Sequence, residues 1–167
     1  MIATAQQVVD RYASTPCNPN TGPRILANER ADLYGHGDFF LTHIGQMYVG
    51  HIPNCRMEYA EVHWDDVYGL CATSTGYIEI QDSYGNRKGT AYPSDPCLDG
   101  GWWTSQYVPI DGWVGYYYSK PVVHIGQIWN APFDPSCFTT TFYGNLHDFY
   151  TGYSDSSHNS QNCGGPS

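Results

Sequence analysis

Residues Tyr77 to Ile80 (Tyr-Ile-Glu-Ile) and Lys88 to Tyr92 (Lys-Gly-Thr-Ala-Tyr) lie on either side of the polar segment Asp82-Ser83-Tyr84-Gly85-Asn86. The two outer runs contain β-branched and aromatic residues, and the middle segment contains residues that favour turns. This pattern predicts a β-hairpin with a loop of about five residues. The rest of the chain can be analysed outward from this hairpin.

Further strand patterns lie on both sides of it. The apolar residues between Asp38 and Ile52 predict two short strands that are broken at Gly45. Residues Trp102 to Ile110 and Trp113 to Tyr118 predict a second hairpin, because the Asp111-Gly112 pair between them is a favoured two-residue turn. Later strands are predicted over Val122 to Trp129, Cys137 to Tyr143 and Leu146 to Tyr150.

Together these patterns indicate an all-β protein with one short helix near the N-terminus. Thr4 and Gln7 fit a capping box that would start a helix over Ala5 to Ala13. The 18 glycines and 11 prolines favour a sandwich or barrel over a parallel α/β sheet. The segment Ser154 to Ser167 has few apolar residues, so we expect order there only if Cys163 or a neighbouring molecule holds it.

An internal repeat organises the chain. His43-Ile44-Gly45-Gln46 recurs as His124-Ile125-Gly126-Gln127, 81 residues later. Two flanking cysteine motifs recur with offsets of 80 and 82: Ser14-Thr15-Pro16-Cys17 with Ser94-Asp95-Pro96-Cys97, and Pro53-Asn54-Cys55 with Pro135-Ser136-Cys137. Ordered landmarks at a nearly constant offset indicate a duplication. We expect two tandem diverged repeat units, residues 1–83 and 84–167, within one compact body.

The cysteines predict a disulfide-stapled protein. The chain has six, none in a Cys-x-x-Cys pair and most beside turn-forming residues: Cys17, Cys55, Cys71, Cys97, Cys137 and Cys163. Such a set indicates three disulfides in an oxidising compartment, so we expect an extracellular or cell-surface protein. Three cysteines per unit require at least one bridge between the units. The matched spacings of 38 and 40 residues favour Cys17–Cys55 and Cys97–Cys137, which leaves Cys71–Cys163.

Charge and composition exclude several classes of partner. Seven basic residues against 16 acidic ones give a net charge of -9, which would repel a phosphate backbone, so nucleic acid is not an expected partner. No apolar run approaches the roughly 18 residues of a membrane span. Only 14% of the residues are charged, whereas 16% are aromatic. Neutral polar and aromatic groups must therefore cover much of the surface.

The aromatic residues give the strongest indication of a binding surface. Successive residues of a strand point to opposite faces, so an unbroken aromatic run places some rings on each face of a sheet. Exposed aromatic rings suit sugar rings or another protein surface, whereas buried ones would form a tyrosine-rich core. The predicted surface comprises Trp102, Trp103, Tyr107, Trp113, Tyr116, Tyr117 and Tyr118.

One acidic segment could hold a cation. Carboxylate oxygens are the ligands that hard divalent cations such as calcium prefer. The candidate ligands are Glu58, Glu61, His63, Asp65 and Asp66. Their spacing matches no calcium-binding loop, and the second unit keeps His147 and Asp148 but little of the acidic set. The segment is therefore interpreted as a solvated acidic turn or, alternatively, as a cation site, and no other cofactor is expected.

His43 and His124 are candidate metal ligands or general bases, or structural residues beside a required glycine. Residues 37–50 resemble the strand that carries the catalytic histidine of NlpC/P60 cell-wall cysteine peptidases. This resemblance implies that His43 acts as a base for a cysteine at the start of an upstream helix. The only upstream cysteine, Cys17, lies in Thr15-Pro16-Cys17-Asn18-Pro19, whose prolines oppose a helix. We therefore assign no family.

These observations favour a non-enzymatic extracellular structural or binding protein. We expect it to associate with copies of itself, as a matrix or filament subunit, or with extracellular matrix or glycan. The first alternative is a glycan-binding module that uses the exposed aromatic residues. The second is a cell-wall or glycan hydrolase in which His43 works with carboxylates.

Overall fold

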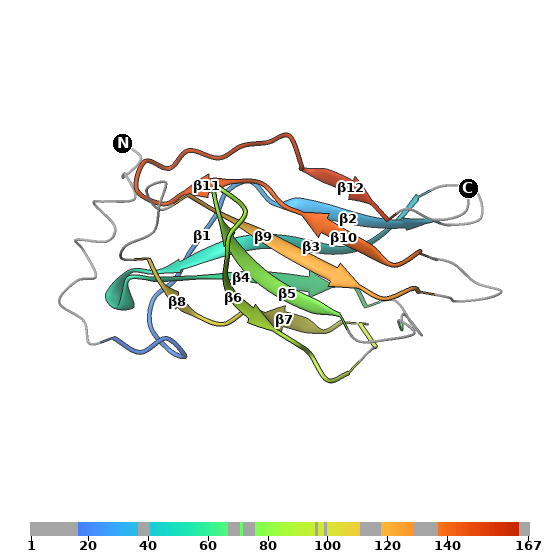
Figure 1. Ribbon diagram of the computed structural model, residues 1–167, viewed down its shortest axis with the longest axis horizontal. Helices are drawn as coiled ribbons and strands as arrows, with labels where there is room; N and C mark the ends of the chain where they lie inside the picture. Colours follow the sequence, from blue (N-terminus) through green and yellow to red (C-terminus); the bar gives the residue numbers. More distant parts are fainter. Residues whose placement is uncertain are drawn as a thin grey trace.

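The computed structural model shows two β-sheets packed face to face, and the described strands do not close into a barrel (Figure 1). It describes residues 17–36, 41–66, 71, 76–95, 97–98, 100–110, 118–128 and 137–163. In this part of the chain the one helical element is a 3-10 turn, Pro53–Cys55. The predicted all-β class is confirmed, and the architecture is a sandwich. The predicted helix over 5–13 lies outside the described residues.

The larger sheet has the strand order β12-β2-β3-β4-β7, with β1 paired to β3 and β8 paired to β4. Its strands are β1 (Ile25–Leu26), β2 (Ala31–His36), β3 (Leu41–Ile52), β4 (Met57–Trp64), β7 (Trp102–Thr104), β8 (Val108–Pro109) and β12 (Ser160–Asn162). All of these pairings are antiparallel except that of β12 with β2.

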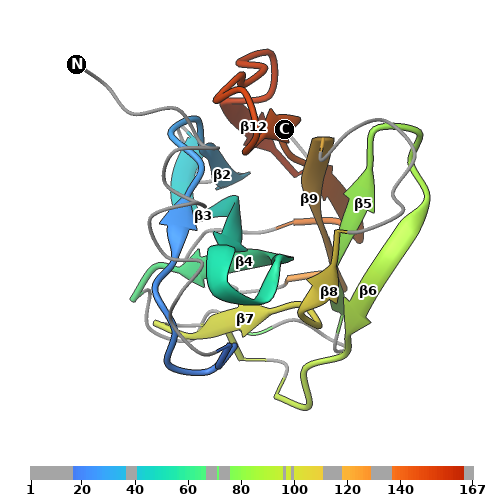
Figure 2. The same cartoon turned by 90° about the vertical axis from the view of Figure 1, so that its left-hand side faces the viewer.

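The smaller sheet has the order β10-β9-β5-β6, with β11 also paired to β9. Its strands are β5 (Tyr77–Asp82), β6 (Arg87–Ala91), β9 (Tyr118–Ile125), β10 (Thr140–Tyr143) and β11 (His147–Asp148). Viewed along the sandwich, β3 and β4 lie on one side of the core and β5 and β9 on the other (Figure 2).

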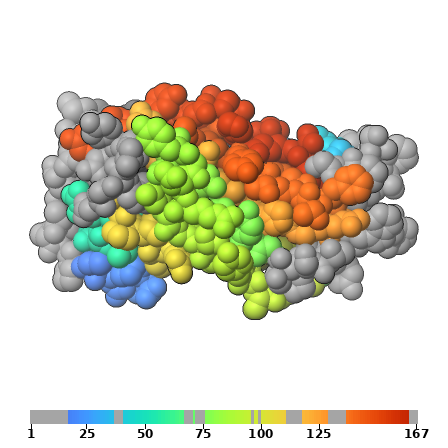
Figure 3. Space-filling model, in the orientation of Figure 1, coloured from blue at the N-terminus to red at the C-terminus, as the bar shows by residue number. Residues whose placement is uncertain are grey.

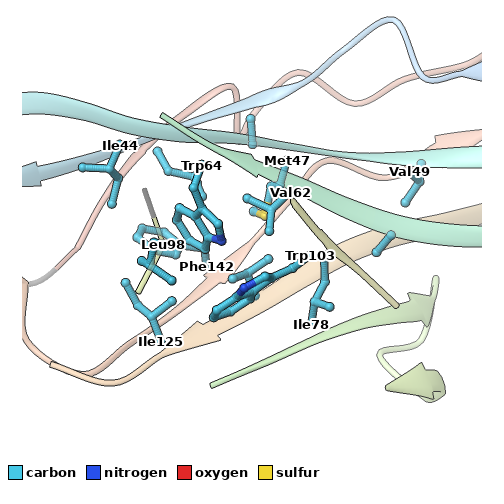
Figure 4. Packing of buried hydrophobic residues seen from close by; sticks show 14 of the residues in the cluster. Ile44, Met47, Val49, Val62, Trp64, Ile78, Leu98, Trp103, Ile125 and Phe142 are labelled. Carbon is cyan, nitrogen blue, oxygen red and sulfur yellow. The ribbon is translucent and has the colours of Figure 1, made fainter. Parts of the chain in front are cut away.

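The core lies between the two sheets (Figure 4). Trp64 on β4 packs edge to face against Trp103 on β7, with ring centroids 5.3 Å apart. Ile78 on β5 and Phe142 on β10 contribute apolar side chains from the smaller sheet. Burial of these large side chains from both sheets stabilises the sandwich through the hydrophobic effect.

Several predicted strands are confirmed. The hairpin around Asp82 to Asn86 forms β5 and β6, and the three later strands correspond to β9, β10 and β11 with shifted ends. The predicted break at Gly45 is wrong, because β3 continues through it to Ile52. The run from Trp102 to Ile110 forms two short strands that pair with β4. The predicted turn at 111–112 lies outside the described residues.

Three disulfides are present, as predicted, but only one of the favoured pairings is confirmed. Cys17 bonds to Cys55, whereas Cys71 bonds to Cys97 and Cys137 to Cys163. The predicted Cys97–Cys137 and Cys71–Cys163 bridges are therefore wrong. The reason is that the fold brings Cys71 opposite Cys97 as partners in an antiparallel bridge, which spacing along the chain does not reveal. The Cys71–Cys97 bond does connect the two predicted units.

The Cys137–Cys163 bond also holds the C-terminal segment, where β12 pairs with β2. Disulfides of this kind fit an oxidising compartment outside the cytosol. Among the described residues, no helix has the length and apolar character needed to cross a membrane.

The two copies of His-Ile-Gly-Gln lie in different sheets, and each begins in an interior strand. His43 and Ile44 belong to β3, and His124 and Ile125 end β9. In both copies the isoleucine is fully buried and the histidine is partly exposed. The strands pair differently around the two motifs, and the duplication into units 1–83 and 84–167 stays a prediction.

Candidate functional site

A row of polar and aromatic side chains crosses the outer face of the larger sheet. The strand register pairs Asp32 on β2 with Gln46 on β3, Gln46 with His63 on β4, and His63 with Trp102 on β7. Neighbouring strands lie about 4.8 Å apart, so the row spans roughly 14 Å. We call these four residues the outer row.

Trp102 ends the outer row with a supported and exposed ring. Its indole stacks on the imidazole of His63, with centroids 3.9 Å apart and planes only 11° from parallel. The side chain is nevertheless 57% exposed. Because β7 is the last strand on this side of the sheet, the indole face away from His63 lies at the sheet edge. An aromatic surface held in place by a neighbour loses little side-chain freedom when a ligand stacks on it.

A β-bulge brings His43 to the same face. The β2–β3 register shifts between Leu33 and Tyr34, which leaves Ile44 without a paired residue on β2. A bulge re-aims the side chains around it. Ile44 can therefore be fully buried while His43, the residue before it, reaches carboxylates on the outer face.

Gly45 follows the bulge directly and allows a close approach between two strands. A Cβ atom at this position would lie 2.8 Å from Cε3 of Trp64 and 3.0 Å from the carbonyl oxygen of His63. The first distance is shorter than packed atoms tolerate, and the second lies at that limit. The glycine of the His-Ile-Gly-Gln motif is thus explained in this copy by contact with the core tryptophan.

His43 bridges two carboxylates. Its Nε2 lies 2.9 Å from Oδ1 of Asp32, and its Nδ1 contacts Oδ2 of Asp65. Ionised carboxylates only accept hydrogen bonds, so both contacts are satisfied together only when both ring nitrogens carry protons. Burial alone would lower the pKa of His43, but the hydrogen bonds and charges of Asp65 and Asp32 outweigh it and raise the pKa above 6.5. The protonated imidazolium is therefore favoured.

Hydrogen bonds connect Asp32, one of the two carboxylates beside His43, to Gln46 of the outer row and from there to Arg30. Gln46 donates a hydrogen bond to Oδ1 of Asp32 over 3.1 Å and accepts one from Arg30 over 3.4 Å. The guanidinium of Arg30 also covers the ring of Tyr48, 4.8 Å from its centroid. Side chains from β2, β3 and the end of β4 thereby hold one another in position.

Glu61 forms a second fixed acceptor on this face. Its carboxylate accepts hydrogen bonds from the hydroxyl of Tyr48 (2.6 Å) and from the hydroxyl of Thr104 (2.8 Å). Burial and the bond to Glu61 raise the pKa of the Tyr48 hydroxyl, so it remains a donor at neutral pH. The outer face therefore offers oriented carboxylates, an amide and one exposed indole.

The residues of the predicted aromatic surface differ in their exposure. Trp102 is exposed as expected, but Trp103 is 6% exposed and belongs to the core, because alternate residues of β7 point to opposite faces. Tyr107 is half-buried against Tyr59 and Arg24, and Tyr118 is half-buried against Tyr153. The remaining three predicted residues, Trp113, Tyr116 and Tyr117, lie outside the described residues.

The five predicted cation ligands are not brought together. Glu58 points into the interior, whereas Glu61 lies on the outer face with Tyr48 and Thr104. His63 stacks on Trp102, and Asp65 contacts His43. Asp66 is exposed near Gly100. In the described segments, no three side chains of the types that bind metals are grouped so that they could hold an ion. Strand alternation separates these residues although they are close in sequence, and the cation site stays a prediction.

Four residues of the site were not identified from the sequence: Asp32, Gln46 as an oriented amide, Arg30 and Tyr48. Gln46 and Tyr48 stand on alternate positions of β3, so strand periodicity could have placed them on one face. Asp32 carried no such signal, because its contact with His43 depends on the bulge.

No protein-family model, curated protein or solved structure matches this chain. Any inference about function therefore starts from the chemistry of the outer face. Exposed aromatic carbon beside fixed hydrogen-bonding groups is a surface that can hold a polyhydroxylated ligand without any reaction.

Proposed function

We propose that this protein is an extracellular, non-enzymatic binding module that holds carbohydrate on the outer face of the larger sheet. The observation that carries the proposal is Trp102, whose ring is fixed on His63, exposed, and aligned with Gln46 and Asp32. A sugar presents apolar C–H groups to an indole and hydroxyls to polar side chains, so this combination fits it.

The carboxylates of the outer face limit the kinds of sugar that are expected to bind there. Asp32, Glu61 and Asp65 place three carboxylates on or beside the outer row. A uronic acid or sulfated sugar would bring like charge close to them, which is unfavourable. Neutral sugars and sugars with an amino group are therefore the expected ligands.

Native gels that contain neutral or amino-sugar polysaccharides test this function. We expect at least one polymer to retard the protein and the Trp102→Ala variant to lose most of this retention, because the stacking surface is removed. Tyr92→Ala is the matched control, since Tyr92 is a 70% exposed aromatic residue that follows β6 of the other sheet. Trp102→Ala should keep the urea midpoint of the wild type, because an exposed side chain contributes little to stability.

Absence of retention by every polymer, or equal loss in both variants, would contradict the proposal. Hydrolysis of a retained polymer that disappears in His43→Ala would instead support a cell-wall or glycan hydrolase. Such an enzyme needs two carboxylates around the scissile bond, and Asp32 and Asp65 would be the candidates.

A second candidate function is self-association as a matrix or filament subunit, favoured by the outer side of the smaller sheet. Figure 3 shows this side, with β5 and β6 in green beside β9 and β10 in orange. Exposed tyrosines lie on or next to these strands, at Tyr92 and Tyr143. Tyr77 lies between Tyr92 and His124, in ring contact with both. Arg87 and Lys120 lie over the rings of Tyr77 and Tyr143, and a surface rich in exposed aromatic rings favours burial against a second copy.

Light scattering and negative-stain microscopy at physiological ionic strength test this candidate. Salt shortens the range of the repulsion caused by the net charge of -9 to about 8 Å, so contact burial should prevail. We expect assemblies larger than a dimer that Tyr92→Ala weakens and Trp102→Ala does not. A strictly monomeric protein at high concentration would contradict it.

A further inference from the structure

Two buried histidines, one from each sheet, contact the same phenylalanine at the end of the sandwich where β3 turns into β4. His51 comes from β3 of the larger sheet, and His147 comes from β11 of the smaller sheet. They are only 1% and 4% exposed. Neither belongs to the carbohydrate site proposed above, and the repeat motif does not include either of them.

Both imidazoles contact the same apolar ring. Phe149 is buried and stacks on His51, with centroids 5.3 Å apart and planes 23° from parallel. It also meets His147 edge to face, with centroids 4.3 Å apart. Contact between the two sheets at this point therefore passes through a His-Phe-His group whose central member cannot neutralise a charge.

The charged groups around the two histidines offer little compensation for added protons. On the larger sheet, Oε1 of Glu58 is 4.0 Å from Nδ1 of His51, too far for a hydrogen bond, and Arg56 adds positive charge. On the smaller sheet, Asp148 adjoins His147. Ser119 on β9 pairs with His147 on one side and with Asp82 on the other. Nζ of Lys88 lies 3.6 Å from Oδ2 of Asp82, so this carboxylate already has a cation beside it. Among the described residues, the charge of Asp148 acts on His147, whereas the carboxylate closest to His51 is that of Glu58.

Burial sets the protonation of this group at neutral pH. Desolvation lowers the pKa of His51 and of His147 to about 4, so both rings are neutral. Desolvation also raises the pKa of the Glu58 carboxyl well above its usual range, and the nearby Asp148 adds to this shift. The Glu58 carboxyl therefore takes up its proton at a higher pH than an ordinary glutamate, which reduces the negative charge beside His51 as pH falls.

We propose that His51, Phe149 and His147 form an acid-sensitive latch, in which protonation of the two imidazoles separates the sheets at this end of the sandwich. Protonation would place two positive charges on either side of one apolar ring. The unfolded chain binds these protons near pH 6.5, whereas the folded chain resists them down to about pH 4. The contribution of the two neutral imidazoles to the free energy of unfolding is thus fully present above pH 6.5 and is lost as pH falls toward 4.

Urea unfolding between pH 4 and 8 tests the latch. The slope of unfolding free energy against pH reports the protons taken up on unfolding. At pH 5.5 we expect the slope to fall by about one proton in His51→Gln and by about two in the double variant with His147→Gln. Ser154→Ala is the matched control, because it removes only the hydroxyl that contacts Nδ1 of His147 and keeps the imidazole. A double variant with the wild-type slope would overturn the proposal.

Hydrogen exchange of the wild-type protein distinguishes local opening from general instability. After correction for intrinsic rates, acidification to pH 4.5 should accelerate exchange in β11 and at the end of β3, while β5 and β6 stay protected. Equal acceleration in all strands would overturn the latch. NMR titration provides a test that needs no variant, because titration of either imidazole near pH 6.5 would also overturn it.

Discussion

His43 and the pair His51 and His147 show how one residue type acquires opposite properties on the two sides of a sheet. His43 stands on the outer face between two carboxylates, and its pKa is raised. His51 lies eight positions along the same strand, faces the core, and has its pKa lowered to about 4. Direct contact with negative charge outweighs desolvation in the first case, and desolvation prevails in the second.

The same contrast applies to two glutamates of β4. Glu58 is fully buried beside His51, whereas Glu61 is fixed by two hydroxyl donors on the outer face. Strand parity alone places Glu58 and Glu61 on opposite faces of β4, whereas His43 and His51, an even number of positions apart, reach opposite faces of β3 because of the bulge at Ile44. The comparison also predicts that identical substitutions on the two faces have opposite effects.

The glutamate pair should give the largest difference. Glu58→Gln removes a buried carboxyl whose raised pKa makes folding less favourable as pH rises above 4.5. We expect this variant to be more stable than the wild type at pH 8, by roughly 1–3 kcal/mol, with the gain vanishing below pH 4.5. Glu61→Gln should instead lose about 1 kcal/mol, because two hydroxyls lose a charged acceptor. Urea unfolding at both pH values measures each change.

If Glu58→Gln and Glu61→Gln destabilise the protein equally at pH 8, the distinction between the two faces of β4 does not hold. Glu58→Asn and Glu61→Asn provide a further check. Both variants remove the charge, as the glutamine variants do, and they also shorten the side chain.

His43→Gln should have a smaller effect with the opposite dependence on pH. Because the folded pKa of His43 is raised, its stabilisation is fully present below pH 6.5 and is lost as pH rises through the folded value. The side chain is 36% exposed, so solvent screening limits the loss to about 1 kcal/mol at pH 6. The loss should shrink at pH 9. A loss that is constant from pH 6 to 9 would show that the imidazolium is not the stabilising form.

Local signals in the sequence predicted much of the fold. The turn-forming residues from Asp82 to Asn86 located β5 and β6, because a short hairpin depends on its own loop. The equal-spacing argument identified the Cys17–Cys55 bond but assigned wrong partners to the other four cysteines. Those partners are set by which strand ends meet in the sandwich, and spacing carries no information about that.

The residues of the candidate site and of the buried histidine group divide in the same way. Trp102 was found from composition, and the burial of Trp103 follows from alternation along β7. Alternation along β4 could also have separated Glu58 from Glu61. The contacts of Asp32 with His43, and of His51 with Phe149, could not be predicted. The first depends on a bulge and the second on contact between two sheets, and neither leaves a periodic pattern.

The pairing of β12 with β2 has a consequence for how the chain folds. Among the described strands β12 comes last, yet it covers the side of β2 that faces away from β3. Asn159, just before it, donates a hydrogen bond to Glu29 across 130 residues of chain. While the protein is being synthesised, β2 therefore keeps one edge with open backbone groups until this distant segment arrives. Such long-range closure is slow, and an open edge meanwhile invites pairing with foreign strands.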